Sequence, residues 1–73
     1  MPTLSERERK ILEIMSENLL LTKSEISYRL SKEGYDGIDD CLRSLMDMDL
    51  IQKVESLGVS FVITQKGLKM VKG

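Results

Sequence analysis

The sequence predicts an α+β fold in which a three-helix core is followed by a small antiparallel β-hairpin and a short C-terminal helix. Capping boxes at Ser5–Glu8 and Thr22–Glu25 mark the starts of two helices. Gly34 marks a tight turn before a third helix, and from Ile51 onward the apolar period changes towards two. The 73 residues leave room for one domain, residues 1–73.

The first helix is expected to start after Ser5, whose hydroxyl can accept the Glu8 amide hydrogen while the Glu8 carboxylate returns the bond. We expect it to end at Asn18. Its apolar residues recur at helical steps, at Leu4, Ile11, Leu12, Met15 and Leu19. The bases Arg7, Arg9 and Lys10 are interleaved with acids, which indicates a solvated face.

A short strand is expected at Leu20-Leu21, because two residues between helix signals are too few for a helix. The second helix is predicted from Lys23 to about Lys32, with Ile26 and Leu30 buried. In the turn that follows, Tyr35 is expected to anchor the two helices by its ring.

Asp36 is a suitable N-cap for the third helix. Its buried stripe is predicted to be Ile38, Cys41, Leu42, Leu45 and Leu50. Asp49 occupies the position where such helices end in the left-handed conformation.

The hairpin is predicted from strands at 51–55 and 59–64, with Gly58 in the connection. Phe61 and Ile63 would face the core and Val62 the opposite side. Thr64 would cap the last helix. In that helix Leu68 and Val71 are expected to pack, and Lys66, Lys69 and Lys72 form a basic stripe.

The composition argues for a binding protein. The chain has one cysteine and no histidine, so the usual zinc sets cannot be assembled and the commonest general base is missing. It also lacks a glycine-rich phosphate loop and a nucleophile elbow. We therefore expect no enzyme activity, no metal and no cofactor. The apolar runs are as short as Leu19-Leu20-Leu21 and the N-terminus lacks a signal-peptide core, so no membrane partner and a cytoplasmic location are expected.

Charge is distributed unevenly along the chain. The formal net charge is −1, but residues 1–35 are neutral, residues 36–49 carry −4 and residues 50–73 carry +3. The predicted third helix is therefore acidic, whereas the hairpin and last helix are basic.

Three patches resemble the winged helix-turn-helix proteins of the MarR-like and ArsR-like kind and their small archaeal and bacterial relatives. They are residues 22–30, residues 38–45 with Leu50-Ile51, and residues 61–67. The resemblance implies that the third helix enters the DNA major groove and that the hairpin is the wing. It places these residues at DNA: Lys23 and Ser24 at phosphate, Asp39, Asp40, Arg43 and Ser44 facing the groove, and Lys53, Ser56 and Ser60 along the wing.

The aspartates depart from the family pattern, because carboxylates are repelled by phosphates. Asp39 and Asp40 lie in the first turn, where the helix dipole favours anions, and this structural role is the interpretation preferred for Asp39. Alternatively, Asp40 accepts a hydrogen bond from a cytosine amino group, or pairs with Arg43 and presents it to a guanine.

Two functions remain open. The first is a transcriptional regulator that binds double-stranded DNA, expected as a homodimer because one domain with few bases buries little DNA. The second is an adaptor that binds a protein partner through the acidic third helix, with Leu57, Val62 and the methionines as exposed apolar contacts.

Overall fold

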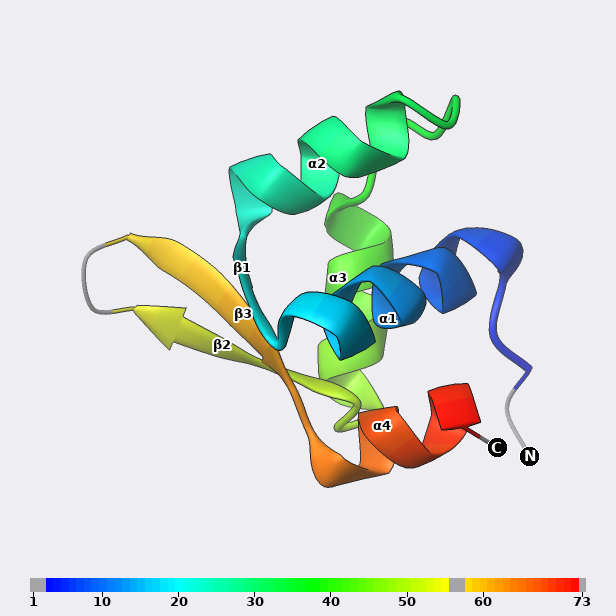
Figure 1. Cartoon of the computed structure of the whole chain (residues 1–73), viewed down its shortest axis with the longest axis vertical. Helices are drawn as coiled ribbons and strands as arrows, with labels where there is room; N and C mark the ends of the chain where they lie inside the picture. Colours follow the sequence, from blue (N-terminus) through cyan, green and yellow to red (C-terminus); the bar gives the residue numbers. More distant parts are fainter. Residues whose placement is uncertain (1–2, 56–57, 73) are drawn as a thin grey trace.

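The structure, a computed structural model, describes residues 3–55 and 58–72 (Figure 1). Its elements are α1 (Glu6–Asn18), β1 (Leu20–Thr22), α2 (Lys23–Ser31), α3 (Asp39–Asp47), β2 (Ile51–Glu55), β3 (Val59–Ile63) and α4 (Gln65–Lys72). The predicted α+β class is confirmed, with four helices and one three-stranded antiparallel sheet among the described residues. Ser56, which was assigned to the wing, and Leu57, which was expected as an exposed apolar contact for a protein partner, lie outside the described residues.

The sheet has the order β1-β3-β2, so β3 is its central strand. Leu21 lies opposite Phe61 in one pair of strands, and Ile51 lies opposite Ile63 in the other. These side chains point to the same face of the sheet, where the helices cover them. The β2–β3 hairpin extends beyond the helices on the left of Figure 1.

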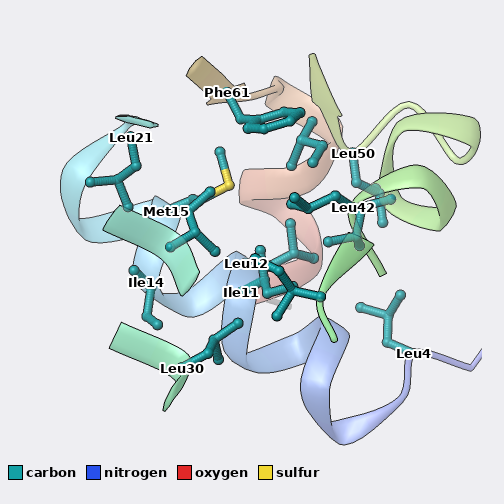
Figure 2. Packing of buried hydrophobic residues seen from close by; sticks show 14 residues of the cluster. Leu4, Ile11, Leu12, Ile14, Met15, Leu21, Leu30, Leu42, Leu50 and Phe61 are labelled. Carbon is teal, nitrogen blue, oxygen red and sulfur yellow. The ribbon is translucent and has the colours of Figure 1, made fainter. Parts of the chain in front are cut away.

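One apolar cluster joins all the helices to the covered face of the sheet (Figure 2). Its fully buried side chains come from α1, α2, α3 and the start of β2: Ile11, Leu12, Met15, Ile26, Leu30, Leu45, Leu50 and Ile51. Phe61 of β3 lies at one end of the cluster and Leu4, which precedes α1, lies towards the other. The helical stripes predicted from sequence spacing therefore meet in a single core, except that Leu19, predicted to be part of the first stripe, is 56% exposed and Cys41 is only partly buried.

Both predicted capping boxes are confirmed. The Glu8 amide donates to Ser5 Oγ over 3.1 Å and the Ser5 amide donates to Glu8 Oε1 over 2.8 Å. At α2 the Glu25 amide donates to Thr22 Oγ1 over 3.1 Å, and the Thr22 amide donates to Glu25 Oε1 over 2.9 Å. The bond from the Ser5 amide is the largest cause of the lowered pKa of Glu8, and the bond from the Thr22 amide is the largest cause of the lowered pKa of Glu25.

The predicted N-cap of the third helix is wrong. α3 begins at Asp39, and its N-cap is Ile38, which makes no side-chain capping bond; Asp36 lies outside the helix. The reason is that Gly37 takes a φ of +65°, a left-handed break that separates Asp36 from the helix. Ile38 is only 5% exposed, so burial of its side chain, instead of a polar cap, fixes where α3 begins.

The turn between α2 and α3 is held by α1. Gly34 has a φ of +86°, as a sharp reversal requires, and the Tyr35 ring packs against the core. The Arg7 guanidinium lies 6.0 Å from the centre of that ring, and Lys10 Nζ lies 2.9 Å from Glu33 Oε1. Arg7 and Lys10 are half-buried, so the expectation of a solvated basic face is wrong for both and holds for Arg9 alone.

A second junction joins α3, the hairpin and α4. Asp49 ends α3 with a φ of 61°, as predicted, and its carbonyl accepts a 2.7 Å bond from Thr64 Oγ1. The same hydroxyl oxygen accepts the Gly67 amide at 3.0 Å, which confirms Thr64 as the cap of α4. The Thr64 amide donates to the Leu50 carbonyl over 3.0 Å. One threonine thus fixes the position of α4 relative to the end of α3.

Gly67 has no space for a side chain. A Cβ atom there would overlap the Leu50 carbonyl oxygen and lie 2.7 Å from Ile63 Cγ1. This close approach lets Met70 and Val71 of α4 pack against the core. Val71 was predicted to do so, and Leu68 is partly buried.

None of the described helices is long and apolar enough to cross a membrane.

We predict that Gly67→Ala lowers the free energy of unfolding by about 1–3 kcal/mol, because the added methyl group must displace backbone at Leu50. Helix propensity alone predicts the opposite sign, a gain of about 1 kcal/mol. Urea unfolding measures the difference, with Lys66→Ala at the exposed neighbouring position as the control. A Gly67→Ala protein as stable as the wild type would show that α4 does not dock this closely.

The two capping glutamates predict a pH dependence. Their folded pKa values are lowered, so the stability they add is present above the unfolded glutamate pKa of about 4.3 and is lost as the pH falls through the folded values. Replacing both Glu8 and Glu25 with Gln should lower the free energy of unfolding at neutral pH. It should also make the decrease of that free energy between pH 7 and pH 3 smaller than in the wild type. Urea unfolding between pH 7 and pH 3 tests this. The pair Glu13→Gln and Glu17→Gln, on the exposed face of α1, should keep the wild-type pH dependence.

Candidate nucleic-acid interface

The starts of α2 and α3 are joined by an ion pair. Lys23 Nζ lies 2.6 Å from Asp39 Oδ1, in the first turn of each helix. Thr22, the residue before Lys23, lies opposite Ser60 of β3. The structure therefore brings together Lys23 and Asp39, two of the residues assigned to the interface from sequence, and Ser60 lies in the strand that pairs with the residue before Lys23.

A hollow of about 520 Å³ opens between α2 and the segment that leads into α3. Lys23 and Ser24 line one part of it, and Asp36 to Asp39 line another. Four further residues that sequence reasoning did not assign to a site also line it: Ser27, Tyr28, Ser31 and Tyr35. The signal was available, because Ser24, Ser27, Tyr28 and Ser31 recur three and four residues apart along α2.

The outward face of α3 carries Asp40, Arg43 and Asp47, all exposed and three or four residues apart. Leu42 and Leu45 on the opposite side are buried, so this face points away from the core. Ser44 is half-buried at the margin of that face. Its hydroxyl reaches the Glu8 carboxylate of α1, where it helps to lower the pKa of Glu8 after the larger effect of the Ser5 amide.

Lys53 and Ser60, the two described hairpin residues that were assigned to DNA from sequence, do not lie together. Lys53 lies opposite Phe61 and Ser60 lies opposite Val54, so the Lys53 and Ser60 side chains point to opposite faces of the hairpin. Lys53 lies on the face that, further along the strands, covers the core. Its Nζ is 3.6 Å from Glu55 Oε2.

The bases of this region are therefore balanced by acids. Lys23 is paired with Asp39 and Lys53 with Glu55, and Arg43 shares its face with Asp40 and Asp47. The pairs are exposed, and exposed ion pairs contribute about 0–1 kcal/mol. Either lysine can consequently exchange its carboxylate for another anion at little cost.

Within residues 3–55 and 58–72, no three side chains of Cys, Asp or Glu are arranged to hold a metal ion. Comparison of the chain with protein-family models, with curated proteins and with solved structures finds no match.

Proposed function

We propose that the chain is a winged helix-turn-helix protein that binds duplex DNA through α3 and the β2–β3 hairpin and acts as a transcriptional regulator. The order of elements supports this proposal: α2 and α3 form the helix-turn-helix, and the hairpin follows them as a wing. The sheet order β1-β3-β2 also supports it, because β3 of the hairpin pairs with β1, which leads directly into α2.

The observation that carries the proposal is the ion pair between Lys23 and Asp39. It joins a lysine in the first turn of α2 to the first turn of α3, and Ser24 and Ser27 of α2 line the same hollow as both residues. Lysine and serine side chains are common donors to DNA phosphates, and such contacts fix how a recognition helix sits in the major groove. On that helix, Arg43 is the residue suited to a guanine, and Asp40 to a cytosine amino group.

The Lys23–Asp39 pair makes the proposal testable. If phosphate replaces Asp39 as the partner of Lys23, Asp39→Asn should strengthen binding to a random duplex, because it frees the lysine and removes a repelling charge. The slope of log affinity against log salt should become steeper by about 0.9 for one added phosphate contact. Fluorescence anisotropy from about 50 mM salt upward measures both quantities.

Glu17→Gln changes the net charge equally, on the exposed side of α1, and is the matched control. Arg43→Glu should weaken binding. The proposal fails if the wild-type chain does not bind duplex DNA at about 50 mM salt, or if Asp39→Asn binds no more tightly than Glu17→Gln.

A second candidate function is an adaptor that binds a protein through the outward face of α3. It is favoured by the exposed carboxylates of Asp40 and Asp47, and by the fact that Lys23 and Lys53 already have acidic partners. Val62 on the central strand was expected to be an exposed apolar contact, but it is half-buried. Leu20, which lies opposite it in β1 and is 55% exposed, would be the apolar contact instead. A partner with a basic surface would fit this face.

The double reversal Asp40→Lys and Asp47→Lys separates the two functions. It should abolish a complex with a protein partner but strengthen binding to duplex DNA, while far-UV circular dichroism stays unchanged. The matched reversal of Glu13 and Glu17 controls for net charge. If a purified partner binds both variants equally well, the adaptor function is excluded.

A further inference from the structure

β2 is a free edge of the sheet. The order β1-β3-β2 leaves one side of β2 without a strand among the described residues, and in Figure 1 β2 forms the outer margin of the hairpin. Residues 52–55 are all exposed, and Val54, the apolar residue among them, is 36% exposed. An edge of this kind can pair with another strand through its backbone.

The hydrogen bonds show which backbone groups point outward from β2. The Thr64 amide donates to the Leu50 carbonyl, at the position next to the Ile51 and Ile63 pair in the register. Because bonded positions alternate along an antiparallel pair, Gln52 and Val54 also turn their backbone groups towards β3. The backbone groups of Lys53 and Glu55 therefore point to the open side.

The other edge of β3 agrees with this assignment. The Ile63 amide donates to the Leu19 carbonyl, so Ile63 and Phe61 direct their backbone groups towards β1. Ser60 and Val62 are then left to bond with Val54 and Gln52 of β2.

We propose that a second copy of this chain pairs with the free edge, antiparallel, so that β2 of one copy lies against β2 of the other. Val54 lies opposite the partner's Val54 on the two-fold axis. Lys53 then lies opposite the partner's Glu55, and Glu55 lies opposite the partner's Lys53. The two three-stranded sheets become one sheet of six strands.

Charge selects this register. In a two-fold pair of β2 strands, the residues with outward backbone groups must lie opposite residues of the same kind in the other copy. The two-fold axis therefore passes through a residue and not between two residues. Within 53–55 the candidates for that residue are Lys53, Val54 and Glu55. Centring on Lys53 opposes two lysines, and centring on Glu55 opposes two glutamates. Directly opposed like charges are destabilising, whereas opposed Lys and Glu are favourable. The Val54 register alone gives two favourable pairs.

The existing ion pair fits the same arrangement. Lys53 Nζ lies 3.6 Å from Glu55 Oε2 on one face of the strand, so pairing would set four alternating charges side by side. Val54 would be covered on the other face, where Ser60 and Thr22 are its neighbours in the sheet. Such a contact is smaller than the roughly 1,200 Å² of stable complexes, so the dimer forms reversibly as protein concentration rises.

Charge substitution tests the register. Lys53→Glu and Glu55→Lys should each weaken the dimer by about tenfold or more, because both create opposed like charges. The double swap, Lys53→Glu with Glu55→Lys, should restore it, and an equimolar mixture of the two single variants should form a heterodimer. Sedimentation equilibrium without DNA, up to about millimolar protein at low salt, measures each association.

Amide hydrogen exchange adds an independent readout. Gln52 and Val54 should be protected at every concentration, and Lys53 and Glu55 only where the dimer is populated. The inference is overturned if the wild-type chain stays monomeric, if either single variant associates as well as wild type, or if the double swap does not regain association. Because no DNA is present, these outcomes are independent of the proposed function.

Discussion

The close approach of α4 to the end of α3 is the constraint on which the arrangement depends. Thr64 bonds the Asp49 and Leu50 carbonyls and caps α4, and Gly67 leaves the space in which the Leu50 carbonyl sits. Because the strands β2 and β3 begin and end at this corner, it also fixes where the hairpin leaves the core. The directions of α3 and the hairpin, the two parts of the candidate interface, are thus set by a few polar contacts beside an apolar cluster.

Pairing with lysines offsets part of the negative charge that the candidate interface presents. A region with five aspartates and one arginine between residues 36 and 49 is an unfavourable surface for DNA if every carboxylate is exposed to phosphate. The Lys23–Asp39 pair shows that at least one of these carboxylates has a partner within the fold. In the proposed complex with DNA, Lys23 would exchange Asp39 for a phosphate, and the freed carboxylate would remain near that phosphate and limit the affinity.

The hairpin is part of both the proposed DNA contact and the proposed dimer, but different features of it are involved in each. For DNA, it matters that Lys53 and Ser60 lie on opposite faces, since a wing that enters a groove can present both. For self-association, it matters that Lys53 and Glu55 turn their backbone groups outward while their side chains carry complementary charges. A dimer formed through β2 would supply the second DNA-binding module that a single small domain needs for tight binding.

The sequence by itself determined the elements. Capping boxes at Ser5 and Thr22, the left-handed positions at Gly34 and Asp49, and the alternation after Ile51 are local signals, and each depends on neighbours within a few residues. Only the tertiary structure decided the start of α3, the partial burial of Arg7 and Lys10, the pairing of Lys23 with Asp39 and the opposite directions of Lys53 and Ser60. These features depend on contacts between segments distant in sequence. Burial of Ile38 overrode a good local cap at Asp36, and packing of α1 over the turn partly shielded two bases from solvent.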